Sequence, residues 1–305
     1  MEQELTKSPE ATPTRPTPRK RPAWFSSLFT FRFFSEETPK ISPQAVVDPK
    51  AEIAEDVEIG PFCVIGPDVE LGEGCELISH VVVAGHAKIG ARTRIYPFAS
   101  LGHPPQDLTY AGEATTLTVG SDCIIREGVT MNPGTARGTR ATVVGDRCAF
   151  FANSHVAHDC VVGNNVIMSN NVMLGGHCRI GDFVILGGGV GVHQFVRIGS
   201  HAFAAGMSAL PEDVIPYGMA LGNRAHLAGL NIVGMRRRGF TREQIHDVRR
   251  AYRLLFADEG TLKERVEDVA EEFSKHPIVH EILDFIREGA DRAICTPRRD
   301  PAEPG

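Results

Sequence analysis

Aliphatic residues recur at every sixth position over a long stretch of the chain. The first run has no miss and consists of Val47, Ile53, Ile59, Ile65, Leu71, Leu77, Val83, Ile89, Ile95 and Leu101. The same frame returns at Val119, Ile125 and Met131, and then from Val144 to Ile198. A period of six fits neither an amphipathic helix nor a simple alternating strand, so the pattern predicts short strands separated by turns.

A second position in each hexad, four residues after the first, is small or short-branched. Cysteines often occupy it, namely Cys63, Cys75, Cys123, Cys148, Cys160 and Cys178. Free cysteine packs as a small hydrophobe, so we expect these residues in the core. Three hexads would close one triangular coil, and stacked coils would share a continuous apolar interior. The pattern covers residues 41–218, with insertions near 102–117 and 137–143 that should leave the stack as loops.

Helical signals replace the hexads over residues 219–290. Thr241 with Gln244 forms one capping box, and Thr261 with Glu264 forms another. The Pro-, Thr- and Arg-rich residues 1–40 are predicted to be a disordered extension, and residues 291–305 a disordered tail. The predicted fold is therefore mostly β-structure, followed by a small α-helical C-terminal domain.

Charge and cysteine usage narrow the classes of protein that the chain could be. A formal net charge of -6 argues against a nucleic-acid-binding protein, which usually carries a basic face. The seven cysteines form no CxxC pair, which favours a reducing compartment. The sequence lacks the roughly 18 consecutive apolar residues that span a membrane. We therefore expect a cytoplasmic protein without a membrane span.

Histidines cluster late in the repeat, at His155, His158, His177, His193 and His201. With about three hexads in each coil, several of these side chains are expected to line one groove. An imidazole is suited to proton transfer near neutral pH, and Asp159 follows His158 directly. The cluster predicts a site for general acid–base chemistry.

The segment Asn153-Ser154-His155-Val156-Ala157-His158-Asp159-Cys160 resembles the catalytic segment of the UDP-N-acetylglucosamine acyltransferases, members of the hexapeptide-repeat transferases. Further matches are Gln106-Asp107-Leu108-Thr109-Tyr110-Ala111-Gly112-Glu113, Gly175-Gly176-His177, Val192-His193-Gln194-Phe195, Gly222-Asn223, Asn231-Ile232-Val233-Gly234 and Arg237-Arg238-Gly239-Phe240. The resemblance implies a left-handed parallel β-helix and a homotrimer with sites between subunits.

The same resemblance implies a reaction and the residues that perform it. A 3-hydroxyacyl group would pass from the phosphopantetheine of acyl carrier protein to the 3-position of UDP-N-acetylglucosamine, the first step of lipid A synthesis, without a metal or further cofactor. His158 would be the general base, Asp159 would orient it, and the backbone amide of Gly176 would stabilise the oxyanion. The implied substrate-binding residues are Gln106, Asp107, His155, His177, His193, Gln194, Asn231, Arg237 and Arg238. Gly206 and Phe203 would set the acyl length, and the Arg236–Arg238 run would dock the carrier protein.

Three positions depart from the family's usual pattern, namely Thr109, Asn132 and Arg224. They leave open whether the acceptor presents a 3-hydroxyl, giving an ester, or a 3-amine, giving an amide. Two other classes share such a repeat. A zinc enzyme of the γ-carbonic-anhydrase type needs three imidazoles on one metal, and a non-enzymatic scaffold needs no ordered histidines.

Overall fold

The structure is a computed structural model that describes residues 40–289 and 291–298. Nearly all of the predicted N-terminal extension, and residues 299–305 of the predicted tail, lie outside the described residues. The described residues belong to one unit that begins at residue 39. Within them, no helix combines the length and the apolar character needed to cross a membrane.

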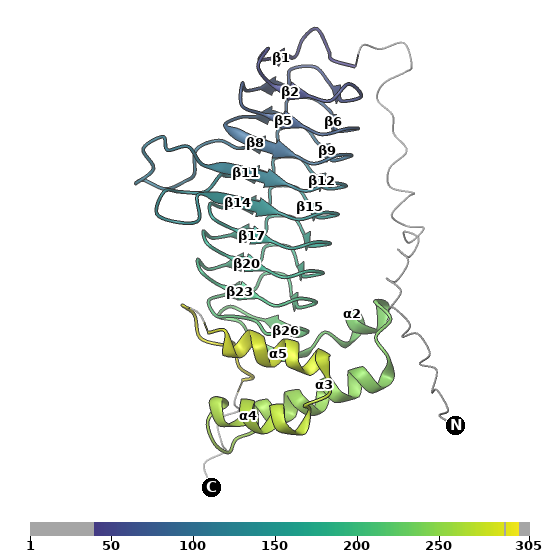
Figure 1. Ribbon diagram of the computed structural model, residues 1–305, viewed down its shortest axis with the longest axis vertical. Helices are drawn as coiled ribbons and strands as arrows, with labels where there is room; N and C mark the ends of the chain where they lie inside the picture. Colours follow the sequence, from purple (N-terminus) through teal and green to yellow (C-terminus); the bar gives the residue numbers. More distant parts are fainter. Residues whose placement is uncertain (1–39, 290, 299–305) are drawn as a thin grey trace, which may run out of the picture. The chain divides into compact units, whose positions relative to one another are not determined.

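Three sheets run side by side along a stack of coils (Figure 1). The first sheet contains β1 (Val46–Val47), β4 (Val64–Ile65), β7 (Val82–Val83), β10 (Ser100–Leu101), β13 (Thr130–Met131), β16 (His155–Val156), β19 (Met173–Leu174), β22 (Gly191–Val192) and β25 (Ala209–Leu210). The second contains β2 (Glu52–Ile53), β5 (Glu70–Leu71), β8 (His86–Ile89), β11 (Thr116–Val119), β14 (Ala141–Val144), β17 (Val161–Val162), β20 (Arg179–Ile180) and β23 (Arg197–Ile198). The third contains β3 (Glu58–Ile59), β6 (Glu76–Leu77), β9 (Arg94–Ile95), β12 (Ile124–Ile125), β15 (Ala149–Phe150), β18 (Ile167–Met168), β21 (Ile185–Leu186), β24 (Phe203–Ala204), β26 (Gly218–Leu221) and β27 (His226–Leu230).

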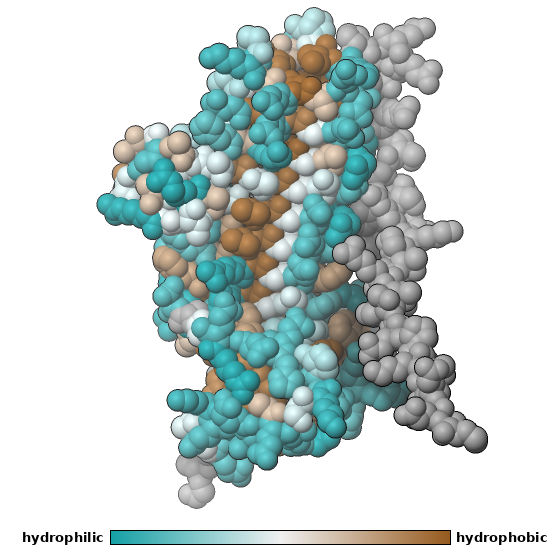
Figure 2. Space-filling model, in the orientation of Figure 1, coloured by the Kyte–Doolittle hydropathy of each residue, from teal (hydrophilic) through white to brown (hydrophobic). Residues whose placement is uncertain are grey.

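The hexad explains why each strand has a buried and an outward residue. In β4, Val64 faces outward and Ile65 is 2% exposed, and the next coil pairs with it in parallel at Val82 and Val83. Equivalent positions of the hexad therefore lie above one another in successive coils and form one apolar interior. Each fully buried aliphatic side chain contributes about 1.5–3 kcal/mol to the free energy of folding. Figure 2 shows an apolar band along the face of the second sheet, flanked by polar residues.

Each coil turns at three corners, and most turns place one residue in the left-handed region. The first corner lies between the first and second sheets and includes Arg140, Asp159, His177 and Phe195. The second lies between the second and third sheets and includes Arg92, Asp122, Arg147, Asn165, Phe183, His201 and Tyr217. The third lies between the third and first sheets and includes Phe62, His80, Phe98, Asn153, Asn171 and Met207. This conformation costs a non-glycine residue on the order of 1 kcal/mol, so stacking of the coils must offset it.

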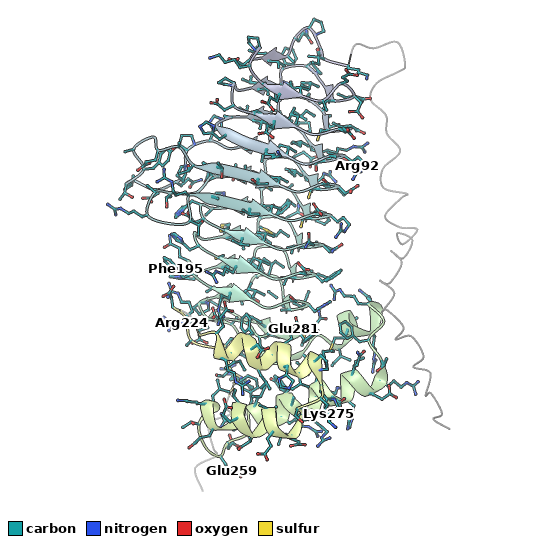
Figure 3. The ribbon with its side chains drawn as sticks, in the orientation of Figure 1. Arg92, Phe195, Arg224, Glu259, Lys275 and Glu281 are labelled. Atoms are coloured by element: carbon teal, nitrogen blue, oxygen red, sulfur yellow. The ribbon has the colours of Figure 1, made fainter. Side chains whose placement is uncertain are left out.

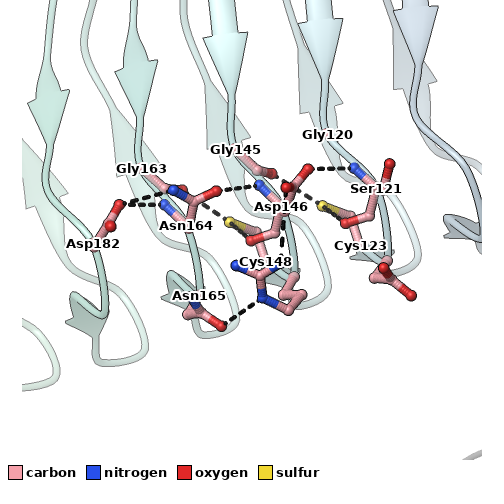
Figure 4. Close-up of polar contacts among 12 residues, drawn as sticks. Gly120, Ser121, Cys123, Gly145, Asp146, Cys148, Gly163, Asn164, Asn165 and Asp182 are labelled. Carbon is pink, nitrogen blue, oxygen red and sulfur yellow. Dashed lines mark hydrogen bonds and ion pairs between the residues drawn. The ribbon is translucent and has the colours of Figure 1, made fainter. Parts of the chain in front are cut away.

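Polar ladders tie neighbouring coils together at the second corner (Figure 4). The backbone N–H of Ser121 donates to Asp146 at 2.8 Å, that of Asp146 to Asn164 at 2.9 Å, and that of Asn164 to Asp182 at 2.7 Å. The thiol of Cys148 donates to a carbonyl in the next coil. The six hexad cysteines are all buried free thiols, so their predicted role in core packing is confirmed.

Two loops leave the stack at the first corner, on the left in Figure 1. The first, residues 102–115, joins β10 to β11, and the second, residues 132–140, joins β13 to β14. The second insertion therefore begins and ends earlier than the predicted 137–143, because β13 ends at Met131 and residues 141–144 already form a strand that pairs with the coils on both sides.

The helices begin later than predicted. After β26 the chain forms the antiparallel partner β27, so residues 219–230 extend the third sheet instead of opening the helical domain. The helices are α2 (Ile232–Arg237), α3 (Arg242–Leu255), α4 (Leu262–Glu272) and α5 (Pro277–Arg287). Both predicted capping boxes are present, at the starts of α3 and α4.

The predicted disordered tail at 291–305 is wrong for its first part. Asp213 donates its N–H to Ala293 and accepts from the N–H of Cys295, each at 2.8 Å, and Leu227 donates to Thr296 at 3.0 Å. Cys295 is 1% exposed. Residues 291–298 are therefore an extended segment bound to the C-terminal end of the stack.

Candidate active site

His158 and Asp159 follow β16 at the first corner and form a hydrogen-bonded pair. Nδ1 of His158 lies 2.8 Å from Oδ2 of Asp159, and the two side chains are 9% and 0% exposed. An ionised carboxylate only accepts hydrogen bonds, so Nδ1 carries the proton and donates it. The lone pair of the imidazole is thereby placed on Nε2, the form that a general base requires.

The second loop surrounds the carboxylate of Asp159 with donors. It accepts from the N–H of Thr135 at 3.1 Å, from the hydroxyl of Thr135 at 2.7 Å and from the N–H of Thr139 at 2.8 Å. Burial would raise the pKa of Asp159, but the hydrogen bonds from Thr135 and His158 outweigh burial and lower it. A side chain on Gly138 would overlap the carboxylate. The loop thus holds Asp159 ionised beside His158, a role of Thr135 and Thr139 that sequence reasoning missed.

Gly176 occupies the position one coil below His158, and its missing side chain leaves room for the imidazole. A methyl group built on Gly176 would lie 2.5 Å from Cε1 and 2.7 Å from Nε2 of His158. Such distances are far inside van der Waals contact, so any side chain would displace the ring. The position of His158 therefore requires glycine here.

His177 completes the column of rings at the first corner. Its ring meets that of His158 edge to face, with centroids 5.0 Å apart, and stacks on Phe195 at 4.4 Å. Its Nδ1 lies 3.9 Å from Oδ2 of Asp159. Burial lowers the pKa of His177, and the charge of Asp159 opposes this only in part. Phe195 lies at the edge of the stack (Figure 3) and was not predicted as a site residue, although the coil repeat from His177 points to it.

Other predicted residues lie around this corner. His155 faces outward from β16, with Nδ1 2.7 Å from the hydroxyl of Thr130, and burial lowers its pKa. His193 and Gln194 are exposed in the coil below Gly176. Asp107 lies in the first loop, whose residue Gln106 is exposed. The backbone N–H and hydroxyl of Thr109 lower the pKa of Asp107, and the charge of Asp107 in turn acts to raise the pKa of His177.

The remaining histidine and the C-terminal polar residues lie at the second corner. His201 stacks there between Phe183 and Tyr217, so it is not among the histidines that line the first corner. Asn231 caps α2, accepting from Gly234 at 3.0 Å and donating to the carbonyl of His201 at 2.8 Å.

The two predicted arginines divide between this corner and the surface. Arg238 is half-buried and donates to the carbonyl of Phe183 at 2.8 Å, while Arg237 is exposed on α2. A single chain therefore does not bring Asn231, Arg237 or Arg238 to the corner that carries His158. Gly206 is exposed at the third corner, and Phe203 is half-buried on β24.

One group among the described residues could hold a metal ion, namely His158, Asp159 and His177, whose ligand atoms lie within 4.8 Å of one another. Asp159, however, already accepts hydrogen bonds from His158, Thr135 and Thr139. A zinc ligand would have to give up several of these bonds. The donor set therefore favours proton transfer over metal binding at this corner.

Comparisons with known proteins show which family has this fold and sequence. A family model described as bacterial transferase hexapeptide matches residues 50–85 and 141–176, and one described as UDP-N-acetylglucosamine O-acyltransferase, domain 2, matches residues 213–295. A protein of Methylobacterium radiotolerans, named acyl-(acyl-carrier-protein)-UDP-N-acetylglucosamine O-acyltransferase, is 66% identical over 208 residues, which cover 68% of this chain and 76% of the relative. A protein of Rhizobium etli with the same name is 54% identical over 263 residues, which cover 86% and 97% of the two chains.

Solved structures agree. The UDP-N-acetylglucosamine O-acyltransferase of Moraxella catarrhalis superposes with a TM-score of 0.82 at 40% identity, covering 84% of this chain and 100% of the other. The enzyme of Campylobacter jejuni gives 0.81 at 36% identity, covering 85% and 100%.

Fold and site together define an acyltransferase of the hexapeptide-repeat class, and the predicted left-handed parallel β-helix is confirmed. Within that class, the chain belongs to the family of acyl-(acyl-carrier-protein)-UDP-N-acetylglucosamine O-acyltransferases.

Proposed function

We propose that this enzyme transfers a 3-hydroxyacyl group from acyl carrier protein to the 3-hydroxyl of UDP-N-acetylglucosamine, the first step of lipid A synthesis. The observation that carries the proposal is the buried His158–Asp159 pair, with Nε2 against the backbone of Gly176. All seven cysteines are free thiols, which supports a reducing, cytoplasmic setting.

The mechanism follows from the pair. Nε2 of His158 removes the proton from the sugar hydroxyl as its oxygen attacks the thioester carbonyl. The negative charge on the tetrahedral carbon's oxygen is met by the N–H of Gly176, and Asp159 stabilises the imidazolium that forms. When the carbon–sulfur bond breaks, the phosphopantetheine thiolate takes the proton back from His158. A positioned base of this kind contributes about 10²- to 10⁴-fold to the rate.

Substrate contacts require residues from two corners, and this supports a homotrimer with shared sites. Asp107, His155, His177 and Gln194 surround the first corner, where they would bind the nucleotide sugar. Arg237 is exposed on α2, from which a neighbouring subunit could bring it to the phosphates. Sedimentation equilibrium should give a trimer, whereas a monomer at working concentration would contradict a shared site.

Gly206 should leave room for a long acyl chain of the 3-hydroxytetradecanoyl class. It is exposed, and a methyl group built on it would meet only the backbone of Gly188, at 3.2 Å. Gly206→Met should therefore shorten the preferred chain, measured as turnover across a panel of acyl lengths. An unchanged optimum would remove Gly206 from this role.

An amide-forming reaction on a 3-amino sugar is the second candidate. One departure from the family pattern, Asn132, is buried, and its amide donates to the carbonyl of His103 at 3.1 Å. Asn132 thus connects the second loop to the first. Its departure from the family pattern therefore changes how the two loops contact each other beside the site where the acceptor would bind.

The decisive experiment is an assay of UDP-N-acetylglucosamine and its 3-amino analogue with 3-hydroxyacyl carrier proteins, using His158→Ala as the control. We expect an ester product and a dependence on His158. A preference for the amine would select the amide reaction, and no turnover of either sugar would contradict both.

A further inference from the structure

The C-terminal segment 291–298 places Arg292 against the catalytic corner. Nη2 of Arg292 lies 2.7 Å from Nδ1 of His193, and its Nε donates to the carbonyl of Gln194 at 3.0 Å. These partners lie 99 and 98 residues away in the sequence. One guanidinium thus contacts two consecutive residues of the coil below Gly176.

This contact determines the tautomer of His193. A guanidinium only donates hydrogen bonds, so Nδ1 of His193 must accept and carries no proton. Nδ1 also lies 3.2 Å from the carbonyl of Gln194, but two acceptors form no hydrogen bond, and that carbonyl already accepts from Arg292. The proton of neutral His193 is therefore on Nε2.

The segment is held firmly enough to fix the arginine. Backbone hydrogen bonds to Asp213 anchor it on both sides of Ile294, and Cys295 is buried. The neighbouring residue Asp291 is close enough for its charge to act on His177. Residues 291 and 292 thus reach the corner that carries the predicted chemistry.

We propose that Arg292 is a positioning residue that fixes His193 as an Nε2–H donor toward the bound substrate. The inference rests on the proposed acyl transfer, in which His193 binds a hydroxyl group of the sugar or the acyl chain. Arg292 acts through His193 and touches no reacting atom. Its contribution belongs to substrate binding, because a donor to a hydroxyl serves the ground state as well as the transition state.

Nitrogen-15 NMR of imidazole-labelled protein tests the contact without any assay. In the native protein, the two-bond proton–nitrogen correlations of His193 should show the Nε2–H tautomer, assigned by their loss in His193→Ala. In Arg292→Ala, His193 should populate the Nδ1–H form as well. A native His193 already protonated on Nδ1, or a pattern unchanged in Arg292→Ala, would overturn the inference.

Steady-state kinetics test the consequence for function. Arg292→Ala should raise KM on the order of tenfold with little change in kcat, the size expected for one charge-assisted hydrogen bond. Arg292→Lys should recover part of the loss, since one donor remains. In a His193→Ala background, Arg292→Ala should have no further effect on KM.

Two controls distinguish a role of Arg292 in positioning His193 from a role in folding of the protein. Arg298→Ala, an exposed arginine of the same segment, should leave KM unchanged. Urea denaturation should show that Arg292→Ala remains folded under assay conditions. Equal losses from Arg292→Ala with and without His193 would refute the positioning role. Absence of acyl transfer by the native protein would instead refute the proposed function, while the tautomer measurement would still test the contact.

Discussion

The first and second corners each place a histidine at the same point of the repeat, in the left-handed region, within a stack of aromatic rings. His177 stacks on Phe195 with centroids 4.4 Å apart, and His201 stacks on Phe183 at 4.9 Å. Backbone conformation and ring stacking are thus nearly the same. The two corners differ in what surrounds the rings.

At the first corner the nearest charge is the carboxylate of Asp159, and His158 meets the ring edge to face. At the second corner the charge of the cation Arg238 acts on His201 more strongly than that of Asp182, and Phe240 covers the edge of the ring of His201. Nδ1 of His201 is buried without a hydrogen-bond partner among the described residues. What separates the two corners is therefore the carboxylate of Asp159, which is hydrogen-bonded to the neighbouring ring of His158 and has no counterpart in a hydrogen bond to the ring of His201 among the described residues.

The largest effect should come from Asp159→Asn. An amide donates from its nitrogen, so it would favour the wrong tautomer of His158, and kcat should fall by about 10³- to 10⁴-fold. Asp182→Asn, the matched change at the second corner, should leave kcat unchanged, because among the described residues the carboxylate of Asp182 accepts hydrogen bonds only from the backbone N–H and the side-chain amide of Asn164. Steady-state kinetics should measure kcat for both variants. Similar losses of kcat would contradict the difference between the two corners.

Gly176→Ala should have the next largest effect. The added methyl group would push the ring of His158 aside, and a displacement on the order of 1 Å costs about 10²-fold in rate. Gly66→Ala is the control, because a methyl group there meets Ala84 at an ordinary 3.4 Å. Retention of full kcat by Gly176→Ala, measured beside this control, would show that the ring position does not limit the reaction.

His201→Phe should change stability rather than activity. Burial and the charge of Arg238 lower the pKa of His201 from 6.5 to about 4, although Asp182 opposes the shift. Between these values the unfolded chain binds a proton that the native protein does not, so stability is complete above pH 6.5 and declines as the pH falls toward 4. The variant should flatten this decline, measured by urea denaturation at several pH values. An unchanged pH dependence would mean that His201 is charged or exposed in the native protein.

Metal removal should have the smallest effect, namely none. Chelation should leave kcat unchanged, and the purified enzyme should contain no stoichiometric zinc by elemental analysis, because hydrogen bonds already use the oxygens of Asp159. Loss of activity on chelation, restored by zinc, would favour a metal centre at His158 and His177.

The sequence predicted the stack because its physical cause is local: an aliphatic residue every six positions buries one side chain in each strand. The His158–Asp159 pair was predictable because the two residues are neighbours. The clustering of histidines alone did not place His201, which lies 24 residues after His177, one coil plus one hexad, and is thereby rotated to the next corner. Counting hexads as well as coils would have separated the two histidines.

The hexad pattern could not predict the contacts made by irregular segments. Thr135 and Thr139 lie in an insertion that has no period, so nothing in the pattern directs them to Asp159. Arg292 lies in a short polar stretch whose composition is typical of a disordered tail. Its position depends on a few backbone hydrogen bonds to Asp213 and on the burial of Cys295.

The central claim is that the carboxylate beside the ring makes the first corner reactive and the second one structural. The most direct test is kcat of His158→Ala and His201→Phe in one acyl-transfer assay, with folding checked for both. We predict a loss of at least about 10²-fold for the first variant and native turnover for the second. Native turnover by His158→Ala, or an equal loss in both variants, would contradict this assignment.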